Sequence, residues 1–209
     1  KIINSFKKKY KEIKVFRNIK NQGIGAVRNL IIEKSRGEFL AFFDDDDESV
    51  IDRLKIQYER IIKYKNTFNP SSPIICHSNR EIKYFNGEKR LYKTMGLNTN
   101  RKCPNGENVA KRILLGKPLK DGYGSCPTCC QMAKLSTFKK VQGFDKSFRR
   151  AEDTDLCIRL ALIGTHFVGV DKALVKQNMT LTTDKGVDID FKYSKLLIKK
   201  YKKFINANG

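Results

Sequence analysis

The stretch GEFLAFFDDDD at residues 37–47 joins a nearly continuous apolar run to four consecutive aspartates. The apolar part, residues 38–43, is typical of a strand that is covered on both faces. Like charges at neighbouring positions repel, so one or more of these aspartates should have a raised pKa. Two interpretations of the acidic run remain open: a solvated loop that ends the strand, or a site that binds a cation.

The spacing of Asp44 and Asp46 suits the second interpretation. Two residues apart, they point to the same side of the chain if the extended backbone continues through them. Mg²⁺ and Mn²⁺ prefer oxygen ligands and often share them with substrate phosphates. An Asp-x-Asp pair of this kind can hold one such cation and leave positions open for a diphosphate.

Strands and helices alternate around this stretch. The apolar pattern predicts strands at residues 13–16, 38–43 and 73–78, with helices at 24–35 and 50–64. Further elements are expected downstream: a hairpin at 81–92, a helix at 107–115, a strand at 125–133, a helical turn at 135–141, a helix at 152–163, strands at 166–170 and 174–177, and a basic helix at 188–205. This order predicts an α/β sandwich with a largely parallel sheet, whose ligands bind beyond the carboxyl ends of the strands.

The composition sets limits on the function. The 209 residues are 40% hydrophobic, which excludes a mainly disordered chain. With 43 Lys and Arg against 22 Asp and Glu, the net charge is +21. This charge is typical of a nucleic-acid-binding module, or of lysines spread over solvated surfaces. We expect no membrane-spanning segment and no secretory leader. Since the chain starts at Lys1 without a Met, we expect an upstream part to be missing.

Six cysteines permit two interpretations. Cys126 and Cys129 form one CxxC pair, but no second pair exists, so a four-ligand zinc site would need Cys103 and a further partner at irregular spacing. Reduced thiols in a cytoplasmic protein are the alternative.

Motifs on both sides of the acidic run resemble those of one enzyme family. The upstream set is Asn18-x-x-Asn21-x-Gly23-x-Gly25-Ala26-x-Arg28-Asn29. The downstream set is Gly143-Phe144-Asp145 followed by Arg149-x-x-Glu152-Asp153-x-Asp155-Leu156-x-x-Arg159-Leu160. With residues 37–47 between them, in this order and at this spacing, they resemble family 2 glycosyltransferases over residues 1–180.

The resemblance implies a GT-A fold, which is an α/β fold with a mostly parallel central sheet between helices. It assigns residues 1–185 to the glycosyltransferase domain and leaves residues 186–209 as a basic C-terminal helix. The family's first strand and its base-binding turn are expected upstream of Lys1. By residue, the resemblance implies nucleotide-sugar binding by Asn21, Gly23, Arg28, Asn29, Asp44 and Asp45, Mn²⁺ or Mg²⁺ binding by Asp44 and Asp46, and catalysis by Glu152 and Asp153.

The implied activity is metal-dependent transfer of one sugar, with inversion, from a nucleotide-sugar to a saccharide or lipid-linked acceptor. Asp153 would be the catalytic base. We expect this enzyme to act in bacterial surface polysaccharide or glycoconjugate synthesis, in the cytoplasm or at the inner face of the membrane, without a nucleic-acid partner. Two alternatives remain: a basic nucleic-acid-binding module, and a catalytically inactive relative that serves as a scaffold. Taken alone, Glu152, Asp153 and Asp155 also fit ordinary first-turn acids and an N-cap of a helix.

The basic helix at 188–205 also permits two interpretations. Its lysines alternate with apolar residues such as Phe191 and Leu197. A basic amphipathic helix can lie on an anionic bilayer, near a lipid-linked acceptor. It can equally close the domain with its lysines in solvent.

Overall fold

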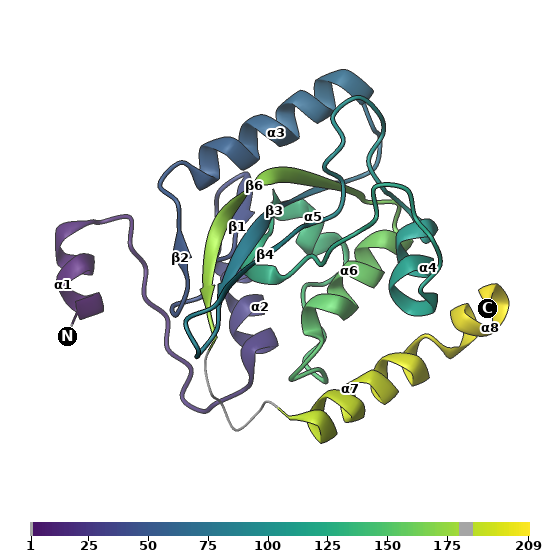
Figure 1. The fold of residues 1–209 in the computed structure, drawn as a ribbon. Coiled ribbons are helices and arrows are strands. Elements are labelled where there is room, and N and C mark those ends of the chain that lie inside the picture. The colour runs from purple at the N-terminus through teal and green to yellow at the C-terminus, as the bar shows by residue number, and fades with distance from the viewer. Residues whose placement is uncertain (1, 180–185) are drawn as a thin grey trace.

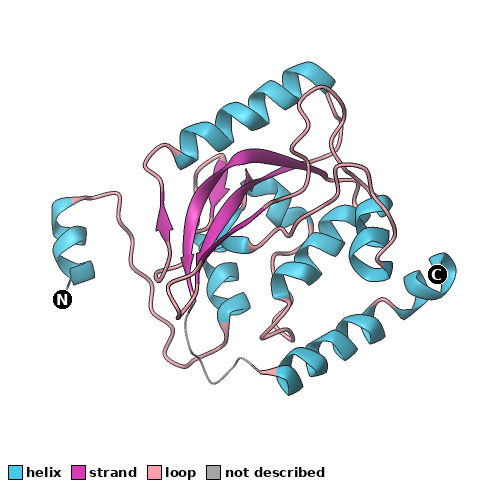
Figure 2. Cartoon of the chain, viewed as in Figure 1, coloured by secondary structure: helices cyan, strands magenta, loops and turns pink. Residues whose placement is uncertain are grey.

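The computed structural model describes residues 2–179 and 186–209. A curved central sheet lies between helices (Figures 1 and 2). Its strands are β1 (Phe39–Ala41), β2 (Glu48–Ser49), β3 (Ile74–Lys83), β4 (Lys89–Tyr92), β5 (Met132–Lys134) and β6 (His166–Asn178). They follow the order β1-β5-β3-β6-β2, with β4 paired to β3. The predicted α/β class with a central sheet flanked by helices is confirmed.

The predicted parallel pairing is wrong for all but one pair of described strands. β3 and β6 are parallel, with Ile75 opposite Phe167, and the other pairs are antiparallel. The reason is that β5, from much later in the chain, lies between β1 and β3 and is antiparallel to both. As a result β1, β3 and β6 still run in the same direction.

The strands differ from the prediction in several further places. Residues 13–16 form no strand. Only the end of the segment 125–133 is extended, because residues 128–130 form the 3-10 turn η1 (Thr128–Cys130). The two short strands expected at 166–170 and 174–177 are one continuous strand, β6. The predicted hairpin is confirmed by the pairing of β3 with β4, and its turn contains Gly87 at a positive φ of 83°.

Two layers of helices cover the sheet. The helices are α1 (Ile2–Lys9), α2 (Ile24–Lys34), α3 (Arg53–Phe68), α4 (Glu107–Leu115), α5 (Leu135–Lys140), α6 (Glu152–Leu162), α7 (Val187–Lys200) and α8 (Lys202–Asn208). Successive residues of a strand face opposite sides. Accordingly Ile75 of β3 packs with residues of α4, α5 and α6, and Cys76 packs with Ile61 of α3. No helix in the described ranges is long and apolar enough to cross a bilayer.

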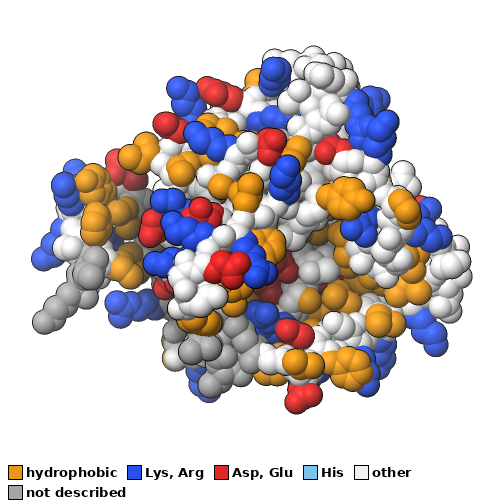
Figure 3. Space-filling view, in the orientation of Figure 1, with side chains coloured by type: hydrophobic (Ala, Val, Ile, Leu, Met, Phe, Trp, Pro, Cys, Tyr) orange, Lys and Arg blue, Asp and Glu red, His pale blue; other side chains and the backbone are white. Residues whose placement is uncertain are grey.

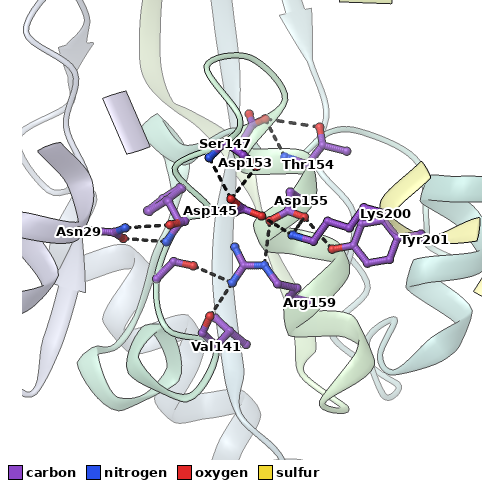
Figure 4. A network of polar contacts seen from close by, with 12 residues as sticks. Asn29, Val141, Asp145, Ser147, Asp153, Thr154, Asp155, Arg159, Lys200 and Tyr201 are labelled. Carbon is purple, nitrogen blue, oxygen red and sulfur yellow. Dashed lines mark hydrogen bonds and ion pairs between the residues drawn. The ribbon is translucent and has the colours of Figure 1, made fainter. Parts of the chain in front are cut away.

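The C-terminal helices are attached to α6 by a buried carboxylate (Figure 4). Asp155 is fully buried and accepts hydrogen bonds from Arg159 Nε at 2.8 Å, Lys200 Nζ at 2.6 Å and Tyr201 OH at 2.7 Å. Lys200 also donates to Asp145 at 2.7 Å. Tyr201 belongs to the main core cluster. The helix predicted at 188–205 is therefore present as α7 and α8, and it packs against the domain.

Removing the Asp155 carboxylate should destabilise the whole fold. Asp155→Ala leaves Lys200 and Arg159 without their shared partner, and we expect the free energy of unfolding to fall by about 3 kcal/mol, the lower end for a broken buried ion pair. Urea denaturation measures this change. Asp188→Ala, which removes an exposed acid of α7, is the control and should stay within about 0.5 kcal/mol of wild type. Equal stabilities of the two variants would contradict the role assigned to Asp155.

Candidate functional site

A cavity of about 510 Å³ lies where β1 ends, next to the start of α6 and the end of β6. Asp44, Asp45 and Asp46 line it from the acidic run, and Glu152 and Asp153 line it from α6. The two acidic motifs, more than a hundred residues apart in the chain, therefore share one cavity. Its other charged lining residues are Arg28, Arg80 and Arg150.

Arg28 of α2 connects the two acidic motifs. Its guanidinium donates to Glu152 Oε1 at 2.7 Å and to Asp44 Oδ1 at 3.1 Å. The guanidinium carbon also lies over the Phe144 ring, 5.5 Å from the ring centroid. Arg28 is only 5% exposed. A buried guanidinium is stable only when its charge is paired. Arg28 thus holds the end of β1 and the start of α6 at a fixed separation.

The upstream residues predicted to bind the nucleotide have other contacts. Asn21 Oδ1 accepts a hydrogen bond from the backbone N–H of Gly23 at 2.9 Å, and Gly23 has a positive φ of 82° just before α2. Asn29 makes two bonds with the backbone of Phe144, at 2.8 and 2.7 Å. None of these three residues lines the cavity, whereas Arg28, on the same segment, does.

Asn29 fixes the loop that leads to α6. Gly143, at φ 68°, lies so close that a Cβ there would be 2.2 Å from Asn29 Oδ1. A glycine is needed at this position both for its backbone conformation and for this approach. The Gly143-Phe144 motif and Asn29 therefore form one structural joint behind the cavity.

The acid pair at the start of α6 is held in two different ways. Burial and the neighbouring charge of Asp153 raise the pKa of Glu152, and Arg28 opposes this shift. Asp153 Oδ1 accepts the backbone N–H of Thr154 at 2.7 Å, which fixes its carboxylate in the first turn of the helix. Ala151, which directly precedes Glu152, has a left-handed backbone conformation with φ 60°. A helix N-terminus favours the ionised form of such carboxylates.

Asp47 is a feature of the site that the sequence analysis missed. Both of its carboxylate oxygens are buried and have no hydrogen-bond partner in the described part of the chain. Burial, with the charges of Asp46 and Asp44, raises the pKa of Asp47 to about 6. The run of four aspartates gave the signal for such a shift but did not identify which residue carries it.

The possible cation ligands differ in part from the predicted pair. One ligand atom each of Asp44, Asp47 and Cys129 lies within 4.8 Å of the others. Asp46 lines the same cavity but is exposed, and its carbonyl accepts the Asn178 side-chain N–H at 3.0 Å. Unpartnered buried carboxylate oxygens are the donors that a hard divalent cation satisfies. The site therefore suits a cation bound between Asp44 and Asp47, and Asp46 lines the same cavity.

Sequence comparison identifies the class of protein that has this fold and site. The family model described as "Glycosyl transferase family 2" matches residues 1–116, and the chain belongs to this family. The predicted family is thereby confirmed.

Two relatives with similar sequences are also described as glycosyltransferases. An uncharacterized glycosyltransferase of Rickettsia conorii is 29% identical over 193 residues, which are 91% of this chain and 28% of the relative. Another, of Haemophilus influenzae, is 30% identical over 91 residues, 43% of this chain and 36% of the relative. The chain thus spans about a third of these relatives or less.

Solved structures share the fold. The crystal structure of S. aureus TarS 1-349 in complex with UDP-GlcNAc superposes with a TM-score of 0.63 at 20% identity, covering 95% of this chain and 53% of that one. The S. aureus TarS structure gives a TM-score of 0.62 over 96% of this chain and 31% of that one.

The raised pKa of Asp47 predicts a pH-dependent stability in the presence of a chelator. The folded protein binds the Asp47 proton more tightly than the unfolded chain, whose aspartates titrate near 3.8. This contribution to stability is present below pH 4 and is lost as the pH rises through 6. Asp47→Asn stays neutral, so it should be more stable than wild type at pH 7 and lose this advantage at pH 4.

Urea denaturation with EDTA at the two pH values measures this difference. Asp45→Asn, which changes an exposed neighbour in the same run, is the matched control. An Asp47→Asn effect of the same size at both pH values would contradict the assignment.

Proposed function

We propose that this chain is the donor-binding and catalytic part of an inverting glycosyltransferase that moves one sugar from a nucleotide-sugar to a saccharide or lipid-linked acceptor. The observation that carries the proposal is the single cavity lined by the acidic run and by Glu152 and Asp153. Transfer of this kind needs a site for a diphosphate and a proton acceptor on the other side of the sugar. The cavity offers both.

The proton acceptor in this proposal is Asp153. An acceptor hydroxyl is a poor nucleophile near pH 7, and a carboxylate that takes its proton accelerates attack typically ~10²–10⁴-fold. The bond from Thr154 N–H holds Oδ1 of Asp153, so the carboxylate is oriented before substrate arrives. Glu152 is engaged by Arg28, which suits a supporting role for Glu152 rather than proton transfer.

The nucleotide diphosphate would lie against the acidic run. A Mn²⁺ or Mg²⁺ ion there would act as a Lewis acid for the leaving diphosphate. Asp44 and Asp47 are the carboxylates that would hold it, and Asp46, which lines the same cavity, would be a further ligand. Arg80 and Arg150 line the same cavity and supply positive charge for the phosphates. The UDP-GlcNAc complex of S. aureus TarS, which shares this fold, supports a nucleotide-sugar as donor.

Removing either acid should abolish turnover but leave the fold intact. We expect Asp46→Ala and Asp153→Asn each to lower turnover of a nucleotide-sugar with Mn²⁺ at least ~10²-fold, because the first loses a cation ligand and the second loses the base. Glu48→Gln, an exposed acid that does not line the cavity, is the control and should keep wild-type turnover. Circular dichroism verifies folding. Full activity in Asp46→Ala or Asp153→Asn would refute the role of that residue.

The outer face of α7 supports a membrane contact near a lipid-linked acceptor. Val187, Phe191 and Ile198 are 86, 59 and 57% exposed, and their spacing places them in one stripe along the helix. Lys192, Lys195 and Lys199 are also exposed. Figure 3 shows apolar side chains gathered over this part of the molecule. This surface supports the proposal that the enzyme acts at the inner face of a bacterial membrane, in surface polysaccharide or glycoconjugate synthesis.

Neutralising the lysines of α7 should weaken binding to anionic vesicles. Each lysine near such a surface contributes about 1 kcal/mol, so the triple variant K192Q/K195Q/K199Q should bind phosphatidylglycerol vesicles about 100-fold less tightly. Co-sedimentation measures the binding. The control K55Q/K63Q/K65Q removes three exposed charges from α3 instead. An equal loss of vesicle binding in both variants would show that net charge alone drives binding, and would contradict a docking surface on α7.

A further inference from the structure

A second cavity, of about 220 Å³, adjoins the first and shares Arg80, Pro127 and Asp153 with it. Cys126 and Cys157 both line this second cavity. Cys126 belongs to the loop before η1, and Cys157 lies one helical turn after Asp153 on α6. Neither thiol has a part in the proposed function.

Cys126 is the most accessible of the six cysteines. All six are free thiols; Cys126 is partly exposed, and the other five are buried. The sulfur of Cys157 lies 3.7 Å from the Cys126 carbonyl oxygen, to which the thiol donates. Gln131 Nε2 contacts both residues, at 2.9 Å from the Cys126 carbonyl and 3.8 Å from the Cys157 sulfur. The two cysteines are thus held side by side by a shared neighbour.

A buried histidine lies near the same thiol. His77 of β3 is 0% exposed, and neither of its ring nitrogens has a hydrogen-bond partner among the described residues. Its ring stacks on Phe167 at 5.9 Å between centroids, which fixes its orientation. His77 favours ionisation of the Cys126 thiol, and Thr94 Oγ1 lies 3.9 Å from the Cys126 sulfur. An unpartnered buried imidazole beside a thiol is an arrangement that activates the thiol.

We propose that Cys126 and Cys157 are an oxidisable thiol pair, with Cys126 as the reactive thiol, and that a hydroperoxide converts them to a disulfide. The Cys126 thiolate attacks the peroxide O–O bond, takes up one oxygen as a sulfenic acid and releases hydroxide, which gains a proton to become water. The Cys157 thiol then attacks the Cys126 sulfur, and the second oxygen leaves as water. In sum, two thiols and one hydrogen peroxide give one disulfide and two waters.

The electrostatics of the two thiols agree with these roles. Burial opposes ionisation of Cys126, but a hydrogen bond from the Cys157 thiol and the nearby His77 together lower its pKa well below the usual value. The same hydrogen bond, with burial, raises the pKa of Cys157 well above the usual value. Cys126 is therefore the thiolate that attacks, and Cys157 is the thiol that resolves the sulfenic acid.

The disulfide would tie the loop before η1 to the helix that carries Asp153. Asp153 and Cys157 are four residues apart, so they lie on the same face of α6. Both cavities meet at Asp153, and the link would fix their common wall. This inference concerns the thiols alone and does not depend on the proposed glycosyl transfer.

Mass spectrometry of the peroxide-treated chain tests the pair directly. The reduced, folded protein is treated with hydrogen peroxide, its remaining thiols are alkylated, and it is digested with trypsin. We expect the peptides 121–134 and 151–159 to be joined, with fragmentation placing the bond at Cys126 and Cys157. Without peroxide, native iodoacetamide should label Cys126 at least about tenfold faster than any other cysteine.

Matched variants distinguish this pair from the two adjacent cysteines, Cys129 and Cys130. Cys157→Ser should abolish the joined peptide and leave the fast alkylation of Cys126 in place, while Cys130→Ser should still form it. The joined peptide and the labelling rates are measured on the wild-type chain, so a poorly folded variant does not decide the outcome. A bond through Cys129 or Cys130, uniform labelling of the six thiols, or no disulfide after treatment would overturn the proposal.

Discussion

The buried ion pairs of Arg28 are the contacts on which the site depends. Asp44 follows β1 and Glu152 begins α6, and no other described side chain is bonded to both. Arg28 is only 5% exposed, so its buried charge needs both carboxylates as partners. The two acidic motifs therefore bind the two terminal nitrogens of one guanidinium. Asn29, one residue further along α2, holds the Gly143–Phe144 joint behind them. Together these contacts bring Asp153 and the acidic run to one cavity.

Several features in and beside the cavity are unfavourable in the absence of a ligand. Asp47 has two buried oxygens without partners, Glu152 has a raised pKa, and Ala151 has a left-handed backbone. Strain and unpaired charge of this kind gather at sites where a ligand relieves them. The surrounding fold compensates through contacts such as the fully satisfied Asp155, which joins α6 to the C-terminal helices.

Much of this arrangement was predictable because it depends on local patterns. The apolar run before Asp44 predicted β1, and helix periodicity predicted α2, α3, α4 and α6. Strand pairing was not predictable in the same way, since β5 enters between β1 and β3 from a distant part of the chain. The contacts of Asn29 were not predictable for the same reason. Its position in the motif suggested a nucleotide contact, whereas its bonds to the Phe144 backbone depend on tertiary packing. Four identical aspartates likewise gave no means to single out Asp47.

The central claim is that a cation-bound diphosphate lies between the acidic run and Asp153. A crystal structure of the chain with a nucleoside diphosphate and Mn²⁺ tests it most directly, with anomalous scattering to locate the metal. The account predicts one metal peak bound by carboxylates of residues 44–47 and bridged to the diphosphate, with Asp153 facing the open end of the phosphates. An ordered nucleotide bound elsewhere, or a metal away from residues 44–47, would contradict it.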